Sequence, residues 1–196
     1  RTDPHRQARH LQGMLAEFPL SVLYLGNGKP WKYLQFYTDP DFHTAVHQWT
    51  SQLDAFAGFL RREAPPEMAS LLNLEVAISQ SRRDLARTPV IPDGMVQLAP
   101  GVSCLKGPEN LGTQYHQTLE EEGLKLESPL DRLTRPPRSH WNAPVQATDW
   151  VLIHCQTASG VILEDLPREL GELLQAVVTP QERAKWMDLA RQLGAD

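Results

Sequence analysis

The feature that most constrains the fold is a series of six apolar residues spaced as on one face of a helix. From Phe42 to Leu60 the intervals are 4, 3, 4, 3 and 4 residues, which aligns the side chains in a stripe along an α-helix. Asp39 and Pro40 precede the stripe as an N-cap and a first-turn residue. The spacing therefore predicts one long helix that buries a single face. The stripe consists of Phe42, Val46, Trp49, Leu53, Phe56 and Leu60.

A second helical pattern follows after a short break at Pro65–Pro66. Leu71, Leu74 and Ile78 give an apolar edge to a helix over about 67–87. Because the connection is short, we expect the two helices to form an antiparallel helical hairpin over about 40–87.

Three segments have the composition of β-hairpins. The first, about 21–37, centres on an Asn-Gly pair, which supplies the positive φ angles of a tight turn, and its flanks are rich in aromatic and branched residues. The other two lie at about 95–105 and 150–164. Val151–Cys155 is apolar on both faces, so we expect it to be a central strand.

Two helices are expected to complete the chain, over about 166–178 and 180–193. Before the second, Thr-Pro-Gln-Glu forms a capping box with proline at the first helical position. Hairpins and helices together predict an α+β fold. We expect the 196 residues to form a single globular domain, with candidate subdomain boundaries near 107 and at 129–148.

Composition argues against several classes of protein. A net charge of −5 disfavours a dedicated duplex-DNA binder and a polybasic membrane-surface protein. No apolar run reaches the roughly 18 residues of a membrane span. The two cysteines, Cys104 and Cys155, favour reduced thiols in a cytoplasmic protein and leave one bridge open. Because the chain begins at Arg1, we expect an excised or processed part of a larger protein.

The segment Thr134–Asn142 is the first candidate interaction site. It combines Arg135, Arg138 and His140 with Trp141 in an irregular, proline-rich stretch. Arginine and exposed aromatic side chains are frequent at binding hot spots. The alternative is a connector whose tryptophan is anchored in the core.

Aromatic residues in the first predicted hairpin extend this set. Alternation along a strand places Trp31 and Tyr33 on one face. An exposed face of this kind suits a protein partner or stacked single-stranded nucleic acid, whereas aromatic strands usually pack on helices. The acidic run Glu120–Glu122 is expected to be solvated.

A metal site is a further hypothesis. His43 and His47 are four residues apart on the first predicted helix, and Asp54 extends their row. Two histidines and a carboxylate can bind zinc or another transition ion. Histidines that pack on a neighbouring helix are the structural alternative.

The sequence contains no phosphate-binding loop, dinucleotide fingerprint, nucleophile elbow or Cys-x-x-Cys pair, so we expect no cofactor. These observations favour a non-enzymatic domain for protein interaction or regulation. We expect it to act as an accessory part of a larger protein or assembly and to bind a protein partner. A nucleic-acid-associated accessory protein that uses the Arg-rich segments is one alternative. An enzyme with an unfamiliar site is the other, and its candidate residues are His43, His47, His116, His140, His154 and Asp54.

Overall fold

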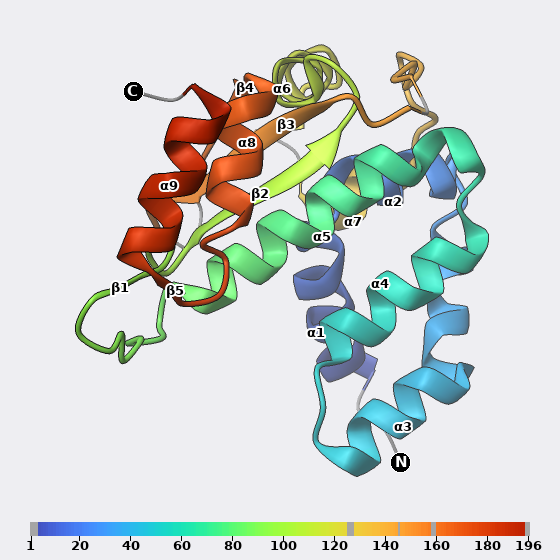
Figure 1. Cartoon of the computed structure of the whole chain (residues 1–196). Coiled ribbons are helices and arrows are strands. Elements are labelled where there is room, and N and C mark those ends of the chain that lie inside the picture. The colour runs from blue at the N-terminus through green and yellow to red at the C-terminus, as the bar shows by residue number, and fades with distance from the viewer. Residues whose placement is uncertain (1–3, 125–127, 145, 158–159, 195–196) are drawn as a thin grey trace. The chain divides into compact units, whose positions relative to one another are not determined.

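The computed structural model describes residues 4–124, 128–144, 146–157 and 160–194, and its architecture is α+β (Figure 1). The predicted fold class is confirmed. The chain forms two compact units, of which unit 1 spans Arg1–Val76 and Tyr115–Ala143, and unit 2 spans Ala77–Gln114 and Pro144–Asp196. None of the described helices has the length and apolar character needed to cross a membrane.

Unit 1 is built from helices. Its core is aromatic: Phe36 meets Phe56 edge to face with ring centroids 5.0 Å apart, and Phe18 packs on Phe56 at 5.7 Å. Such tilted and edge-to-face pairs are favourable beyond the area that they bury. The elements are α1 (Pro4–Glu17), α2 (Pro19–Gly26), the 3₁₀ helix η1 (Pro30–Thr38), α3 (Pro40–Gln48), α4 (Gln52–Glu63), the 3₁₀ turn η2 (Pro66–Met68), the first half of α5 (Ala69–Asp84), most of α6 (Leu111–Glu121) and α7 (Pro129–Arg132).

The predicted β-hairpin over 21–37 is wrong, because α2 and η1 occupy this segment. Asn27 adopts a left-handed conformation with a φ of 43°, and its N–H bonds the carbonyl of Leu23 as a helix C-cap. Pro30 then stands in the first turn of η1. An Asn-Gly pair with positive φ angles can end a helix as well as turn a hairpin, and the flanking prolines favour helix starts.

The long helix predicted from the apolar stripe is two helices. Trp49 is left-handed, with a φ of 55°, and ends α3, while the hydroxyl of Ser51 accepts the N–H of Asp54 and starts α4. Val46 and Trp49 are consequently exposed. Local capping therefore outweighs the continuity of the apolar spacing here.

Unit 2 contains the sheets. The main sheet has the order β2-β3-β4, all antiparallel, so the predicted central strand and the hairpin over 150–164 are confirmed; residues 158–159 of its turn lie outside the described residues. Figure 1 shows α8 and α9 beside this sheet. The elements are β1 (Met95–Val96), β2 (Val102–Gly107), β3 (Asp149–Cys155), β4 (Val161–Leu166), α8 (Arg168–Gln175), β5 (Gln181–Glu182) and α9 (Arg183–Leu193), together with the ends of α5 and α6 that belong to this unit.

The hairpin predicted over 95–105 is wrong, because its two arms pair elsewhere. β1 pairs with β5, with Met95 opposite Glu182, and β2 pairs with β3. Both partners are distant in sequence, whereas a sequence pattern favours neighbouring arms. The last two helices are confirmed, but α9 begins at Arg183, and not at Pro180, since Gln181–Glu182 forms β5.

Alternation along β3 separates two faces of the sheet. Val151, Ile153 and Cys155 are buried on one face, where the Cys155 thiol contacts the carbonyl of Ile78 in α5. The other face carries Trp150, which packs on α8 at Gly171. Glycine is required there, since any β-carbon would overlap the indole.

Replacing Gly171 by alanine should therefore destabilise unit 2. The added β-carbon would lie 2.0 Å from the Cγ atom of Trp150. We expect a loss of about 2 kcal/mol in the free energy of unfolding, measured by urea denaturation, despite the better helix propensity of alanine. Gly13→Ala in α1 is the control, because no atom lies within 4 Å of its added β-carbon. Equal effects of the two substitutions would contradict this packing.

Candidate functional site

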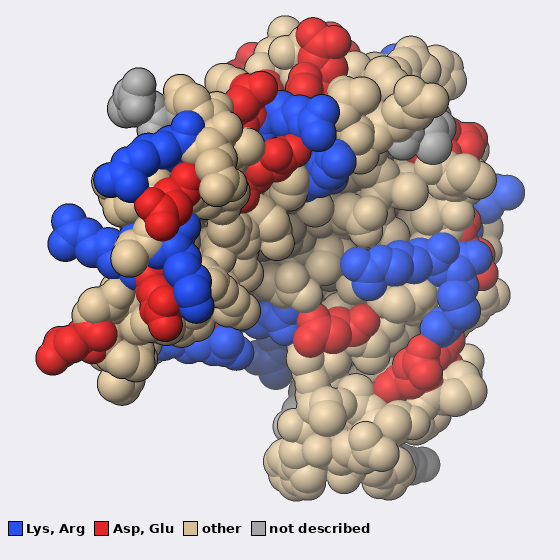
Figure 2. All heavy atoms as spheres, viewed as in Figure 1, with Lys and Arg blue, Asp and Glu red and all other residues tan. Residues whose placement is uncertain are grey.

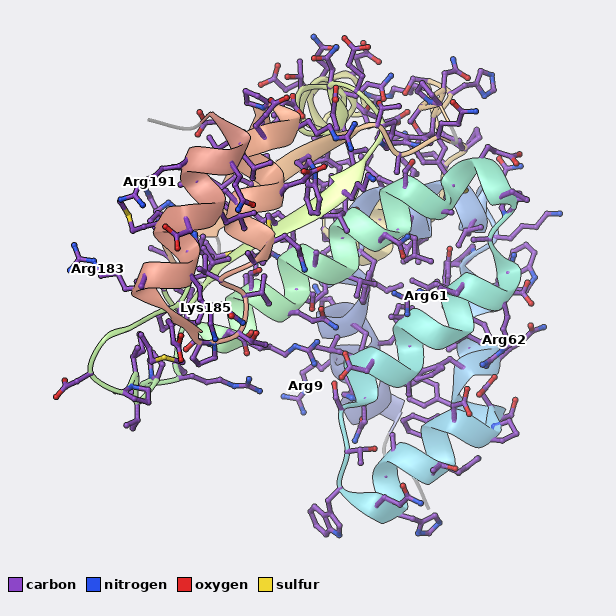
Figure 3. All side chains as sticks on the ribbon, viewed as in Figure 1. Arg9, Arg61, Arg62, Arg183, Lys185 and Arg191 are labelled. Carbon is purple, nitrogen blue, oxygen red and sulfur yellow. The ribbon has the colours of Figure 1, made fainter. Side chains whose placement is uncertain are left out.

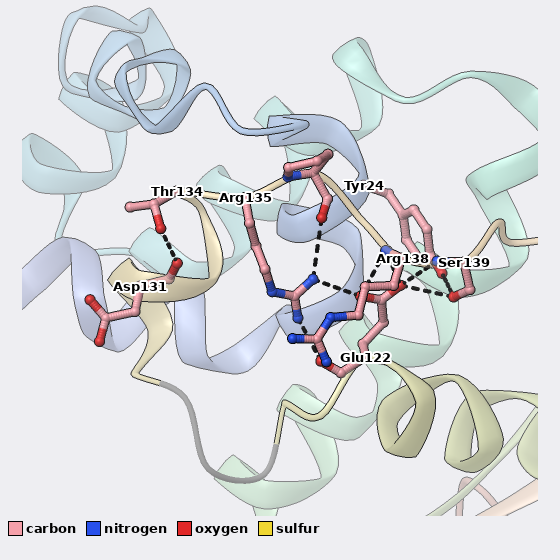
Figure 4. A network of polar contacts seen from close by, with 8 residues as sticks. Tyr24, Glu122, Asp131, Thr134, Arg135, Arg138 and Ser139 are labelled. Atoms are coloured by element: carbon pink, nitrogen blue, oxygen red, sulfur yellow. Dashed lines mark hydrogen bonds and ion pairs between the residues drawn. The ribbon is translucent and has the colours of Figure 1, made fainter.

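Two of the predicted interaction residues, Arg135 and Arg138, hold a buried carboxylate. Glu122 follows α6 and is fully buried, so the predicted solvated acidic run is wrong at this residue. Its Oε2 accepts a hydrogen bond from Nη1 of Arg135 at 2.9 Å, and its Oε1 accepts the N–H of Arg138 at 2.8 Å. Ser139 donates both its N–H and its hydroxyl to Oε1, each at 2.8 Å (Figure 4).

This network fixes the conformation of the 134–142 segment. Burial alone would raise the pKa of Glu122, but the hydrogen bonds from Arg135, Ser139 and Arg138 outweigh it and lower the pKa below its usual value. The hydroxyl of Tyr24 lies 3.0 Å from that of Ser139 and ties the segment to α2. Arg135 thus has a structural role in unit 1.

The aromatic candidates divide between core and surface. Tyr33 is fully buried, and its hydroxyl donates to the carbonyl of Val22. Trp31, two residues earlier, is 61 % exposed, and Leu34 is 56 % exposed. Residues three apart on a 3₁₀ helix align, so Trp31 and Leu34 form an exposed apolar edge of η1 while Tyr33 faces the core.

Two adjoining hollows lie beside η1 in unit 1, and we call them together the unit 1 groove. Their volumes are about 630 and 520 Å³, and they share the lining residues Tyr24, Asn27, Pro65 and Met68. The larger hollow is completed by Glu67, Pro137, His140, Trp141, Asn142 and Ala143. The smaller hollow is completed by Leu25, Gly26, Lys29, Trp31, Lys32 and Gln35.

The unit 1 groove brings together predicted interaction residues from two separate segments of the sequence. Trp31 lines the smaller hollow, and His140 and Trp141 line the larger one. Trp141 is 7 % exposed, and no described group bonds its indole N–H. Neither Tyr24, one of the aromatic residues of the first predicted hairpin, nor Met68 was predicted to belong to the site, because no motif links them to the other lining residues.

Charges differ between the two hollows. Lys29 and Lys32 line the smaller one, whereas Glu67 lines the larger one. Lys32 forms an ion pair with Glu63 at 3.2 Å and also donates to the carbonyl of Leu25. Lys29 is exposed. The groove is therefore basic at one end and carries a carboxylate at the other.

The residues of the metal hypothesis do not form one row. His43 and His47 are exposed on α3, but Asp54 lies in the first turn of α4 because the helix ends at Trp49. Among the described residues, no group of three or more His, Cys, Asp or Glu side chains is arranged to hold a metal ion.

Both cysteines are free thiols within unit 2. Burial raises the pKa of Cys104 to about 11, so this side chain is protonated at neutral pH. Its thiol donates to Oε1 of Gln175, and Cys155 is buried beneath the sheet. A nucleophilic cysteine needs a lowered pKa, which this environment does not give Cys104.

Several basic side chains lie next to acidic ones. Figure 3 labels Arg61 and Arg62 on α4, and Arg62 forms ion pairs with Asp39 and Asp41. On α9, Lys185 pairs with Glu182 and Arg191 with Asp188. The face drawn in Figure 2 accordingly shows basic and acidic groups interspersed over α9, in place of a continuous basic surface.

The unit 1 groove, with the Trp31–Leu34 edge beside it, is the candidate site. It gathers side chains from α2, η1, η2 and the 137–143 segment within one unit. Comparison of this chain with protein-family models, with curated proteins and with solved structures found no match.

Proposed function

We propose that this chain is a non-enzymatic protein-interaction module within a larger assembly, and that the unit 1 groove binds an extended peptide segment of a partner protein. The observation that carries the proposal is the position of Trp31, 61 % exposed at the edge of the groove. Tryptophan is enriched among the residues that dominate binding energies. Contact with a partner would remove both Trp31 and the neighbouring Leu34 from water.

The composition of the groove indicates the chemistry of its partner. Tyr24, Trp31 and Met68 offer apolar walls, which suit an aliphatic or aromatic anchor residue. Lys29 at the adjacent end favours an acidic residue in the bound segment, and Glu67 at the other end disfavours a second acidic residue there. The partner is therefore a segment with an apolar anchor and an acidic residue at one end.

The walls of the groove are held in place before any partner binds. The Glu122 network fixes the 138–139 backbone next to His140 and Trp141, and Tyr24 is tied to Ser139. A preorganised site loses less conformational entropy on binding, which supports affinity for a flexible segment.

Replacing Trp31 by alanine should abolish most of the binding. Affinity capture from native lysate, followed by mapping of the bound segment and titration of the corresponding peptide, measures the effect. We expect Trp31→Ala to weaken the peptide affinity by at least about 30-fold, the loss typical of a hot-spot residue. Lys29→Glu should weaken binding of the same acidic peptide and leave a peptide with lysine in place of its acidic residue unaffected or bound more tightly.

The matched control is Trp49→Ala. Trp49 is 94 % exposed on the α3–α4 turn and does not line the groove. Its replacement therefore tests whether the loss of any exposed tryptophan of unit 1 weakens peptide binding. We expect the Trp49 variant to bind as the wild type does. Equal losses for both variants, or no loss for either, would contradict the proposal.

A further inference from the structure

One buried hydrogen-bond donor of the unit 1 groove has no acceptor within the described part of the chain. Trp141 lines the larger hollow and is 7 % exposed, yet no described group accepts its indole N–H. By comparison, the indole N–H of Trp186 donates to the carbonyl of Leu173 at 3.2 Å. A buried tryptophan N–H usually has a partner, because an unpaired buried donor destabilises the fold. A ligand that accepts this hydrogen bond would therefore be stabilised by it.

The larger hollow is the place from which such an acceptor can come. Its volume of about 630 Å³ is enough to receive a side chain of a bound segment. The Glu122 network holds the 138–139 backbone in place, so Trp141 follows a fixed segment. The hydroxyl of Tyr24, which lines the same hollow, is already paired with that of Ser139 at 3.0 Å. The indole N–H is thus left as an unused donor in the wall of the hollow.

The charge of the hollow restricts the acceptor to an uncharged group. Glu67 lines the hollow together with Trp141. A carboxylate ligand would offer an acceptor to Trp141 but would be repelled by Glu67, whereas an ammonium group would be attracted by Glu67 but has no acceptor. A side-chain amide has both groups. Its oxygen accepts a hydrogen bond, and its N–H₂ group donates to a carboxylate or to the side-chain oxygens of Asn27 and Asn142, which also line the hollow.

We propose that the larger hollow selects a glutamine or asparagine side chain in the bound segment, and that the indole N–H of Trp141 donates to the oxygen of this amide. The inference rests on the proposed function, since the amide belongs to the same peptide whose apolar anchor contacts Trp31. A leucine in place of the amide would leave the donor unpaired. A site that is built to form a hydrogen bond rejects an analogue without the matching group for this reason.

Selection from a library of short random peptides by the immobilised full chain tests the proposal. We expect the wild type to enrich peptides that carry glutamine or asparagine at one position, near an apolar residue and an acidic residue. In a synthetic peptide of this kind, replacing the amide residue by glutamate or by leucine should weaken binding by at least about tenfold.

Two variants of the chain assign the selection to the hollow. Trp141→Phe retains an aromatic ring but removes the N–H donor, so it should bind the amide peptide about tenfold more weakly and the leucine peptide as the wild type does. Glu67→Gln, at an exposed residue, should bind the glutamate peptide about as well as the glutamine peptide, since the repelling carboxylate is gone. Circular dichroism verifies that each variant is folded.

Nuclear magnetic resonance of the wild type tests the same contact without a substitution. The indole N–H signal of Trp141 should move downfield when the amide peptide is added, because the proton enters a hydrogen bond, and should not do so with the leucine peptide. Trp150 is the internal control. Its indole N–H also has no described acceptor, but it lies in unit 2, so its signal should stay in place with both peptides.

The results that overturn this inference differ from those that overturn the proposed function. Enriched peptides that share an apolar residue and an acidic residue but no amide would contradict the inference alone. Equal affinities of the wild type and Trp141→Phe for the amide peptide, or a Trp141 signal that the amide peptide leaves in place, would do the same. A wild-type chain that enriches no peptide would overturn both.

Discussion

Replacing Glu122 by glutamine should lower the free energy of unfolding by about 3 kcal/mol at neutral pH, because it leaves Arg135 without its carboxylate in a buried network. The Glu122 carboxylate accepts four described donor groups, from Arg135, Arg138 and Ser139. An amide has only one acceptor oxygen, and its N–H₂ group would meet donors. Urea denaturation followed by circular dichroism measures the loss. Glu121→Gln, at the exposed neighbour, is the control and should change stability little.

The pH dependence of the Glu122 effect has a defined sign. The folded-state pKa of Glu122 lies below its usual value. The stability that Glu122 contributes is therefore present above the unfolded-state pKa, about 4.3, and is lost as the pH falls through the folded-state pKa. The difference between wild type and Glu122→Gln should shrink toward acid pH. A difference that stays constant between pH 7 and pH 3 would contradict the network.

Glu75 should have the opposite pH dependence. This carboxylate is fully buried in unit 1 and accepts the N–H groups of Leu20 at 2.8 Å and Ser21 at 3.0 Å, in the first turn of α2. The hydroxyl of Tyr115 donates to it at 3.3 Å. Burial raises the pKa of Glu75 to about 7, even though these hydrogen bonds act to lower it.

The raised pKa makes ionisation of Glu75 unfavourable to the fold. Its contribution to stability is fully present below the unfolded-state pKa, about 4.3, and is lost as the pH rises through about 7. Relative to Glu75→Gln, which does not ionise, the wild type should lose about 3 kcal/mol of unfolding free energy between pH 4 and pH 8. Urea denaturation at several pH values measures this trend, with Glu67→Gln, at an exposed residue, as the control. Parallel pH profiles for wild type and Glu75→Gln would show that this carboxyl is not held as described.

Sequence patterns predicted the parts of the fold that depend on local signals. The run Val151–Cys155, which is apolar on both faces of a strand, predicted the central strand, and the spacing of leucines predicted α8. The Asn27-Gly28 pair led to the wrong prediction of a hairpin over 21–37, because a helix C-cap and a hairpin turn both use left-handed backbone conformations. The pairing of β1 with β5 joins residues that are far apart in sequence, which no local pattern encodes.

The candidate site was predictable only in part. The type of side chain alone predicted three interaction residues that line the unit 1 groove, namely Trp31, His140 and Trp141. Tyr24 and Met68, which join its two hollows, come from separate elements and carry no motif. Glu122 gave no signal of burial, since it ends an acidic run and its partners lie in the 134–142 segment.

Photo-crosslinking tests the central claim, that the unit 1 groove binds a partner protein, most directly. A photoreactive phenylalanine analogue in place of Gln35, which lines the groove beside Trp31, or in place of Trp49 in a parallel sample, would be activated in cells that express the natural partner, and the crosslinked peptide would be sequenced. We predict a crosslink from residue 35 to one defined segment of a partner, with an apolar residue and an acidic residue close together, and no crosslink to that segment from residue 49. Crosslinks of equal yield from both positions, or none from residue 35, would contradict the account.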